Sequence, residues 1–512
     1  MRHILKIVLL LLCAPAFATT YYISSGIGDD TANGTSESTP WAHAPGMTGC
    51  ASACAAYTPV AGDQFILRGG DTWTTSGTAN WWIWTWNGSS GSTIQIGGLD
   101  QTWYAGGSWT RPIITGAGTW PGSIMKYFLQ MSGTYTRVSN IEWTGLYWGV
   151  NLTGGIGYIS KYTSTAGHFT TDNNYFHGWS HAPGVLEDGY DNAITCESGG
   201  VFDSTSSVYL NVFDGTDTDQ ASFGGIYGPG CNVVYENYFA YIADAMNGGF
   251  QTIHDNTFFH ASQNVYSGSG SHNNVAESNT DAANLTVYNN VIIHVQGGVG
   301  IWMGPSSGNT SYRFNNIIAD GMPSANNSMC SYALASPGGT CVDFNNTEEC
   351  GPDAGPPSQA CYRMAVGSGQ HAGAASLFNH HWITTDASPY TAIDSGAPTP
   401  TQTSTLAQSL TTANGQGYTL AQSFVFSPTS GGSTIGAGTN KSALCTTISG
   451  VDAAAGTACL SDTTYGVAYN ATTHTASFPA RTSVLRGSIW DVGAYQFLPT
   501  LAPTLPGLSV LQ

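Results

Sequence analysis

The sequence predicts an all-β chain that folds as a right-handed parallel β-helix, a solenoid in which each turn adds one strand to each of several parallel sheets. A six-position phrase returns seven times between Phe169 and Asp320, reading β-prone, variable, polar, Asn, any residue and apolar. Its asparagines lie 16 to 37 residues apart, whereas propeller blades keep a steadier period of about 40 residues. A sandwich or a propeller with Asn-rich turns is the alternative. The anchors are Asn174, Asn211, Asn237, Asn256, Asn274, Asn290 and Asn316.

Within the phrase, the residues alternate as they do in a strand. The position two residues after the anchor is apolar and the position three residues before it is mostly β-branched, as expected for strands with alternating faces. Asparagine tolerates the left-handed conformation of a sharp corner, and its amide can hydrogen-bond the backbone there. We therefore expect the anchors to lie at corners and to form an internal ladder where coils stack.

The first 18 residues have the features of a secretory signal. Arg2 and Lys6 give a basic start, Ile7 to Leu12 form an apolar run, and Ala16-Phe17-Ala18 is a small-x-small cleavage site. The apolar run is too short to span a bilayer. We expect an exported protein, extracellular or periplasmic, without a membrane span.

Composition limits the class of partner. Charged residues are 8% of the chain, against about 25% in typical domains. The formal net charge of −19, with twelve Lys and Arg, argues against nucleic acid as a partner. A solenoid can absorb 512 residues as one array. We expect a monomer with one β-helix domain over residues 19–498, capped at its N-terminal end, and a loose Pro-punctuated tail over residues 499–512.

Ten cysteines follow the predicted signal, an even number that indicates disulfides in an exported chain. We expect Cys196 and Cys231, 35 residues apart, to bridge neighbouring coils. The sequence alone does not fix this connectivity. The expected loop staples are Cys50–Cys54, Cys330–Cys341, Cys350–Cys361 and Cys445–Cys459.

Both ends of the chain carry motifs of a known superfamily. The N-terminal part has a Tyr-Tyr strand, a Gly-x-Asp stretch, a Gly-Thr turn, a Pro-Trp pair and a Gly-Asp-x-hydrophobic strand, and the C-terminal part has AIDSGAP from Ala392 and SIWDVGAYQF from Ser488. In these segments the chain resembles secreted bacterial proteins of the pectate-lyase-like superfamily. The resemblance implies the β-helix but not an activity, because the superfamily holds lyases, hydrolases, epimerases and adhesins. The N-terminal positions are Tyr21, Tyr22, Gly28, Asp29, Gly34, Thr35, Pro40, Trp41, Gly62 and Asp63.

Tryptophans are dense between residues 65 and 160, where ten of them occur. Alternation in the segment WWIWTW places three of them on one strand face. Sugar rings present apolar faces that stack on aromatic rings, so we expect a glycan platform; a loop packed over the rings is the alternative. The candidate substrate-binding residues are Trp82, Trp84, Trp86, Trp148 and Trp179.

Acidic residues gather in the longest coils, with eight of the 31 carboxylates between residues 187 and 219. Insertions in solenoids often build the binding face. A glycosidase needs two carboxyl groups about 5 to 9.5 Å apart, and residues two apart on a strand lie about 6.6 Å apart. Asp217 and Asp219 have a separation within this range if their segment is extended. Crowding of the carboxylates raises the pKa of one of them. The candidate catalytic residues are Asp217, Asp219, Asp188, Asp191 and Glu197, with His181 orienting one of them.

Histidines form two further columns when the phrases are aligned. His254 and His272 share one column, and His260 and His294 share another. Stacked imidazoles can serve as a base or bind a metal. Surface stacking beside tyrosines is the alternative.

The leading functional prediction is a glycoside hydrolase that acts on an extracellular polysaccharide through paired carboxylates. A polysaccharide lyase assisted by Ca²⁺ is one alternative, since acidic loops bind this ion through oxygen atoms. A non-catalytic, adhesin-like binder of glycans is the other. A net charge of −19 repels polyanionic glycans, which favours a neutral or weakly charged substrate.

Overall fold

The computed structural model describes residues 18–498 apart from several loop segments, so the predicted signal and tail lie almost entirely outside the described residues. The segments not described within this range are 76–80, 118–126, 149–157, 164–166, 182–191, 197–204, 216–221, 229, 261–273, 278–283, 296–298, 303, 321–325, 331–337, 351–361, 364, 368–369, 372 and 385–398.

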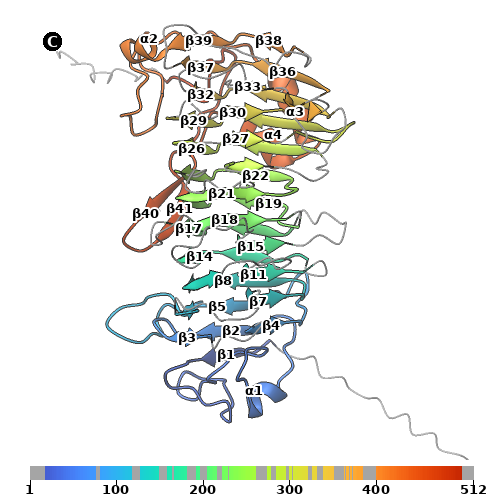
Figure 1. The fold of residues 1–512 in the computed structure, drawn as a ribbon, viewed down its shortest axis with the longest axis vertical. Coiled ribbons are helices and arrows are strands. Elements are labelled where there is room, and N and C mark those ends of the chain that lie inside the picture. Colours follow the sequence, from blue (N-terminus) through green and yellow to red (C-terminus); the bar gives the residue numbers. More distant parts are fainter. Residues whose placement is uncertain are drawn as a thin grey trace, which may run out of the picture.

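Three long parallel sheets wind around one axis and form a parallel β-helix, as the sequence predicts (Figure 1). Sheet 1 has 13 strands, sheet 2 has 12 and sheet 3 has 10, and most coils contribute one strand to each sheet in turn. Sheet 1 consists of β1 (Thr20–Ile23), β2 (Gln64–Leu67), β5 (Ile94–Gly97), β8 (Thr136–Ser139), β12 (Thr170–Asp172), β16 (Ser207–Tyr209), β19 (Val233–Tyr235), β22 (Thr252–His254), β25 (Leu285–Tyr288), β28 (Thr310–Phe314), β31 (Thr340–Phe344), β36 (Ala374–Phe378) and β38 (Thr401–Thr403).

Sheet 2 follows sheet 1 in each coil, and sheet 3 closes the coil. Sheet 2 consists of β3 (Thr72–Thr74), β6 (Ile113–Thr115), β9 (Glu142–Thr144), β13 (Tyr175–His177), β17 (Val212–Asp214), β20 (Tyr238–Ala240), β23 (Thr257–Phe259), β26 (Val291–Ile293), β29 (Ile317–Ala319), β32 (Thr347–Cys350), β37 (His381–Thr384) and β39 (Leu406–Ser409). Sheet 3 consists of β4 (Trp82–Trp84), β7 (Tyr127–Met131), β11 (Tyr158–Tyr162), β15 (Asn192–Cys196), β18 (Ser222–Tyr227), β21 (Ile242–Asn247), β24 (Ala276–Glu277), β27 (Val299–Trp302), β30 (Asn326–Met329) and β33 (Tyr362–Arg363).

Smaller elements complete the fold. Three strand pairs lie outside the three sheets. One is parallel and joins β10 (Leu146–Trp148) to β14 (Trp179–His181). Two are antiparallel and join β34 (Ala365–Gly367) to β35 (Gln370–His371) and β40 (Val467–Asn470) to β41 (Thr475–Pro479). The helices are α1 (Ser52–Ala56), α2 (Leu410–Gly415), α3 (Ser442–Ser449) and α4 (Ala453–Cys459). None of these helices, within the part of the chain that is described, is long and apolar enough to cross a membrane.

The apolar column of the repeated phrase fills the inside of the helix. Phe176, Phe213, Phe239 and Phe258 are buried on successive coils of sheet 2 and stack with ring centroids 4.6 to 4.9 Å apart. This distance matches the spacing of strands in a sheet, so identical residues at one register position meet face to face.

The anchors form the predicted internal ladder at the corner between sheets 1 and 2. Each side-chain amide donates to the amide oxygen of the anchor on the next coil, from Asn174 onward, at 3.0 to 3.2 Å. Two details differ from the prediction. Asn274 precedes β24 in sheet 3 and Asn256 bonds to Asn290 instead, while Asn346 continues the ladder beyond Asn316.

The left-handed conformation belongs to the residue before each anchor, not to the anchor itself. Asn173, Leu210 and Glu236 have φ of 54° to 55°. The anchor amide reaches inward, where it donates to backbone carbonyls of the preceding coil, such as those of Val138, Thr171 and Val208. The same corner on later coils uses Asp255, Asn289, Asn315, Asn345 and Asn379.

Four predicted disulfides are confirmed. Cys50–Cys54, Cys330–Cys341 and Cys445–Cys459 are local staples. Cys196 at the end of β15 pairs with Cys231, which precedes β19 on the next coil. Cys350 is also disulfide-bonded, but its predicted partner Cys361 lies outside the described residues. Disulfides form in oxidising compartments, which fits the predicted export.

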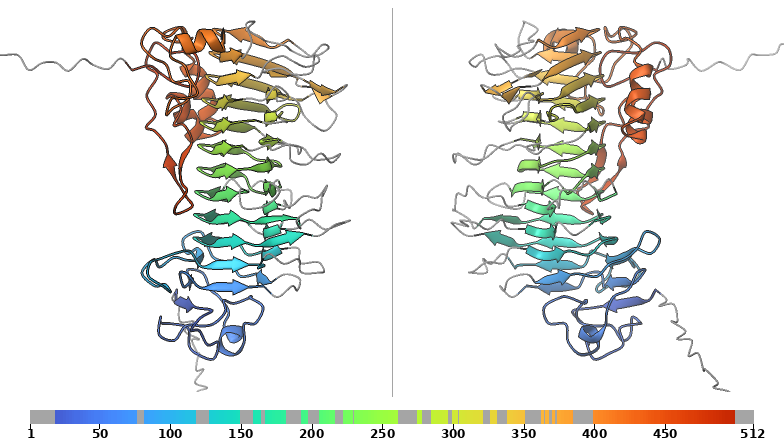
Figure 2. Two further views of the ribbon diagram at one scale, coloured as in Figure 1. Left: turned by 60° about the vertical axis from the view of Figure 1, so that its left-hand side comes forward. Right: turned by 90° about the vertical axis from the view of Figure 1, so that its right-hand side faces the viewer.

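After β39 the chain leaves the stack, and residues 410–498, here called the return segment, run back along the outside of the coils (Figure 2). Its contacts go to sheets 1 and 2 and to the corner between them. Near the C-terminal coils, Asn379 donates to the carbonyl of Thr439 at 2.9 Å. Far down the stack, Arg111 donates to the carbonyl of Thr473 at 3.0 Å and Tyr175 stacks on His474.

The core of the last coils is polar where the earlier coils are apolar. Arg313 donates to Asp343 at 2.7 Å, and the hydroxyl of Tyr362 donates to the same carboxylate at 2.6 Å, all three side chains being buried. His380 takes the ladder position after Asn346. Burial lowers the pKa of its ring to about 3, while a hydrogen bond with the backbone of Asp343 opposes this shift.

Candidate functional site

The acidic residues that the sequence nominates lie outside the described part of the chain. Asp188 and Asp191 directly precede β15, Glu197 directly follows it, and Asp217 and Asp219 precede β18. Their proposed roles stay predictions. In the sequence they flank strands of sheet 3.

His181 and Trp148 are brought together by the backbone, since Trp148 of β10 pairs with His181 of β14 in parallel register. This places one nominated catalytic residue beside one nominated binding residue on adjacent coils.

The prediction of a glycan platform is wrong for three of the five candidate tryptophans. Trp82, Trp84 and Trp179 are fully buried, with their indole nitrogens bonded to backbone carbonyls at 3.0 to 3.1 Å. The alternation in WWIWTW is real, but this face points into the core and Ile83 is exposed instead. Trp86 is half-buried against the ring of Trp84, 4.9 Å away.

Two buried carboxylates, Asp244 and Glu277, lie on the adjacent strands β21 and β24 of sheet 3. Met246 and Ala276 pair and point into the core, so the next residues along the two strands, Asn247 and Glu277, pair on the outer face. Asp244 lies three residues before Asn247. The pair thus comes from two coils, one carboxylate from each.

Each carboxylate is held by an asparagine three residues away on its own coil. Asn247 donates to Oδ2 of Asp244 at 3.0 Å, and Asn274 donates to Oε2 of Glu277 at 2.6 Å. Each coil thus carries an acid and an asparagine three residues apart, in opposite order, as Asp-x-x-Asn and Asn-x-x-Glu. Both acids are therefore fixed in orientation.

Burial and charge set the protonation of Asp244. Its side chain and that of Glu277 are 2% and 0% exposed. Burial raises the pKa of Asp244 well above its ordinary value, and the neighbouring charge of Glu277 raises it further, while the Asn247 hydrogen bond opposes them. Oδ1 of Asp244 has no hydrogen-bond partner among the residues that are described. A neutral Asp244 can therefore hold a proton that no described group accepts.

The outer face around the pair is polar and aromatic. Along one register position, consecutive strands of sheet 3 carry Thr195, Tyr227, Asn247, Glu277 and Trp302. Tyr227 is half-buried, and the other four side chains of this row are buried.

One of the two predicted histidine columns is confirmed. His260 and His294 lie at the corner that leads from sheet 2 to sheet 3, with ring centroids 4.0 Å apart. His254 stacks between Tyr235 and Tyr288, so the expected neighbour His272, which lies outside the described residues, is not next to it in the column.

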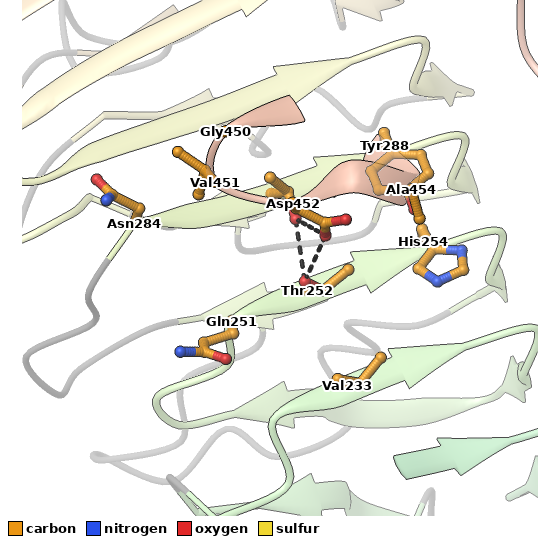
Figure 3. A pocket seen from close by; sticks show the side chains of 11 residues that line it. Val233, Gln251, Thr252, His254, Asn284, Tyr288, Gly450, Val451, Asp452 and Ala454 are labelled. Atoms are coloured by element: carbon orange, nitrogen blue, oxygen red, sulfur yellow. Dashed lines mark hydrogen bonds between the residues drawn. The ribbon is translucent and has the colours of Figure 1, made fainter. Parts of the chain in front are cut away.

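A separate pocket of about 600 Å³ lies between sheet 1 and the return segment (Figure 3). At its centre, Oδ2 of Asp452 accepts from the hydroxyls of Thr252 and Thr286 at 3.0 and 3.1 Å, while Oδ1 accepts from the backbone N–H of Ala455 at the start of α4. The carboxylate is fully used in fastening the return segment to sheet 1, so it is poorly suited to acid–base chemistry.

Metal ligands are not clustered in the described residues, where no group of three or more His, Cys, Asp and Glu side chains could hold an ion. The acidic loops on which the calcium alternative depends lie mostly outside this part of the chain.

Sequence reasoning missed Asp244 and Glu277 because each is a single acid in a short, otherwise apolar strand, IADAMN and VAES. A usable signal was present. Each acid has an asparagine three residues away in the sequence, Asn247 for Asp244 and Asn274 for Glu277.

Comparison with known proteins gives likeness of fold only. No family model matches the chain, and no curated protein matches it. Among solved structures, pectate lyase Pel9A is 14% identical with a TM-score of 0.46, the match covering 94% of this chain and 97% of that one. The GH136 lacto-N-biosidase from Eubacterium ramulus is 13% identical with a TM-score of 0.42, covering 75% and 68%. A rhamnogalacturonan lyase is 12% identical with a TM-score of 0.39, covering 76% and 87%. The fold of this protein, as its own three sheets establish, is a parallel β-helix.

Proposed function

We propose that the protein is an exported, carbohydrate-active enzyme that hydrolyses glycosidic bonds, with Asp244 and Glu277 as its carboxyl pair. The observation that carries the proposal is the position of this pair. Two buried acids lie on neighbouring coils, and burial together with the charge of Glu277 raises the pKa of Asp244. Enzymes arrange burial and like charges in this way when one carboxyl group must stay protonated near neutral pH.

Asp244 acts as the general acid. Its proton passes from the carboxyl group to the glycosidic oxygen as the bond from that oxygen to the anomeric carbon breaks. Glu277 acts as the partner carboxylate, either taking a proton from the water that attacks the anomeric carbon or attacking it directly before water releases the sugar. In both routes one water is consumed, and the pair ends with the protons it began with.

Asparagines keep the pair ready for this chemistry. Asn247 binds Oδ2 of Asp244, which leaves Oδ1 as the oxygen that delivers the proton. Asn274 fixes Glu277 by the 2.6 Å hydrogen bond. Orientation of this kind lowers the barrier because little reorganisation is needed in the transition state.

The test compares Asp244→Asn and Glu277→Gln with the parent on a broad panel of neutral and acidic polysaccharides, measuring the release of reducing ends. Each change should lower turnover of the cleaved glycan by at least about 100-fold, the usual range for a general acid or base. Asp255→Asn is the control, since Asp255 is a buried acid at the corner between sheets 1 and 2. Unchanged hydrolysis by both site variants would exclude the pair.

The nominated loop acids are tested in the same assay. Asp217→Asn and Asp219→Asn that abolish turnover while Asp244→Asn does not would move the catalytic pair to the segment before β18. Products with the ultraviolet absorbance of unsaturated uronates, formed only with added Ca²⁺, would establish the lyase alternative. Binding without turnover on the whole panel would establish the non-catalytic one.

A further inference from the structure

The corner between sheets 2 and 3 carries a row of four large side chains on four successive coils. Tyr241, His260, His294 and Asp320 directly follow β20, β23, β26 and β29. The rings of Tyr241 and His260 stack 4.9 Å apart, and Nδ1 of His294 lies 2.7 Å from Oδ2 of Asp320. Phe259 packs edge-on against both stacked rings. We call these four residues the corner row.

All four corner-row residues have left-handed backbone, with φ between 50° and 68°. On earlier coils the same corner is formed by glycines, of which Gly145 and Gly178 have φ of 70° and 59°. Glycine adopts this conformation freely, whereas a large side chain pays conformational energy for it. The solenoid can therefore turn this corner with glycine, and the large residues are present for another reason.

Core packing is not that reason. Tyr241 and His260 are only half-buried, and the side chain of Asp320 is 50% exposed. Left-handed non-glycine residues also recur at the corner between sheets 1 and 2, so the conformation alone does not mark a site; the stacked, partly exposed rings of Tyr241 and His260 are what distinguish this corner.

The corner row lies next to the carboxyl pair. Tyr241 is the residue before β21, and Asp244 is the third residue after it, a distance of about 10 Å along an extended strand. His260 belongs to the coil that continues to Asn274 and Glu277. A glycan cleaved at the pair therefore extends over the corner row if it lies across sheet 3 towards sheet 2.

The chemistry of the row selects an uncharged ligand. Burial and the neighbouring His294 lower the pKa of His260, so its ring is neutral near pH 7. Tyr241 and Phe259 add apolar ring surface, and Asp320 adds a carboxylate that repels anionic sugars. The chain as a whole has a formal charge of −19, which acts in the same direction.

We propose that the corner row is a binding subsite in which Tyr241 and His260 hold an uncharged sugar unit of the glycan that the Asp244–Glu277 pair cleaves. This proposal rests on the proposed function for its substrate. Its own evidence is the replacement of glycine by large, strained and partly exposed residues beside the pair.

Binding is measured separately from cleavage, by affinity electrophoresis of the Asp244→Asn protein. The probes are xyloglucan, galactomannan and arabinoxylan as neutral glycans, with polygalacturonate and alginate as acidic ones. We expect retardation by at least one neutral glycan and by neither acidic one. Tyr241→Gly and His260→Gly should each weaken the retardation about 3- to 10-fold, in line with the loss of one aromatic contact.

Thermal unfolding separates a binding role from a structural one. Glycine relieves the left-handed strain, so Tyr241→Gly and His260→Gly should unfold at or above the parent temperature while binding less. Leu210→Gly is the matched control, because Leu210 has a φ of 54° at the other corner, between sheets 1 and 2. It should leave binding unchanged.

Three results would overturn the proposal: equal retardation of the glycine variants and the control, binding of acidic glycans alone, or no binding to any probe. Failure of the proposed function has a different signature, since it would show as full turnover by Asp244→Asn with the binding results unaffected.

Discussion

Asp244 illustrates how one residue on a regular scaffold acquires unusual chemistry. The packing around β21 buries its side chain, and the next coil brings the charge of Glu277 close to it. Each cause favours the neutral carboxyl form, and they act together because neighbouring strands lie about 4.8 Å apart.

The raised pKa of Asp244 predicts a pH-dependent effect of its replacement on stability. An unfolded Asp ionises at about pH 3.9, whereas folded Asp244 stays protonated to a higher pH. The folded state thus binds more protons, so stability falls as pH rises from about 3.9 to the folded pKa. Asp244→Asn removes this loss, and its melting temperature relative to the parent should be higher at pH 8 than at pH 4.

Differential scanning calorimetry at both pH values checks this, with Asp255→Asn as the control. Asp255 accepts a hydrogen bond from Thr464 of the return segment and contacts His254 at 2.6 Å, so its replacement should lower the melting temperature. An Asp244→Asn difference that is the same at pH 4 and pH 8 would contradict the assigned protonation state.

At the scale of elements, the asparagine ladder shows why a repeated polar residue can be structural. Each anchor joins its neighbours above and below and serves backbone carbonyls inside the corner. The ladder is interrupted at His380, whose ring cannot present an amide oxygen and an amide N–H in the same geometry.

Replacing His380 with asparagine should extend the ladder by one coil. We expect His380→Asn to raise the free energy of unfolding by roughly 1 kcal/mol at neutral pH, about the value of one restored hydrogen bond. The gain should grow in acid. The folded pKa of His380 is lowered to about 3, so the parent loses stability as pH falls from about 6.5, the unfolded pKa, towards 3.

Urea unfolding at pH 7 and pH 4.5 measures both parts of this prediction. His168→Asn, a change of the same residue types away from the ladder, is the control; it removes the stacking on Tyr135 and the hydrogen bond to Thr205 and should therefore give no gain in stability. A variant at position 380 that is less stable than the parent at both values would show that the ladder does not accept an eighth member.

The sequence predicts those features of the elements that local chemistry determines. The strand phrase, the ladder and four disulfides follow from residue types and short spacings. Asn274 was misassigned because its distances of 18 and 16 residues from its neighbours resemble one coil, although Asn256 and Asn290 are adjacent in the ladder. Trp82 and Trp84 were placed on the wrong side because a period of two residues does not tell which face is the core.

The site could not be predicted in the same way. Asp244 and Glu277 are 33 residues apart in the sequence and meet only because β21 and β24 pair in a particular register. That register depends on the length of the loop between the coils, which carries no periodic signal.

At the scale of the whole molecule, the return segment makes the stack one cooperative unit. Coils of a solenoid contact only their neighbours, and solenoids can therefore unfold from an end. Here the segment after β39 is fastened to coils from Asn379 down to Arg111. Arg486 holds the segment in shape, donating to the carbonyls of Gly493 and Ala494 and to the side chain of Asn315 on the stack.

Arg486→Ala should detach the return segment from the coils. Arg486 is fully buried, so its loss leaves several carbonyls without partners and should cost roughly 3 kcal/mol. Hydrogen exchange should rise over residues 410–498 and over the outer faces of sheets 1 and 2, and unfolding should become multiphasic. Lys441→Ala, which removes a partly exposed cation from the same segment, is the control. A single unfolding transition with unchanged exchange would show that the segment adds nothing to cooperativity.

The return segment also restricts the number of coils that the stack can contain. It is attached to the coils at fixed places, near Thr439 and near Thr473, and the stack between these places rises by about 4.8 Å with every coil. Duplicating or deleting a coil in that interval would shift one attachment point by a full step while leaving the segment the same length. Repeat proteins usually change length by gaining or losing whole repeats. This protein can gain or lose a coil before the coil of Arg111 without disturbing the two attachments. Between the attachments, the return segment would have to change its length by the same step.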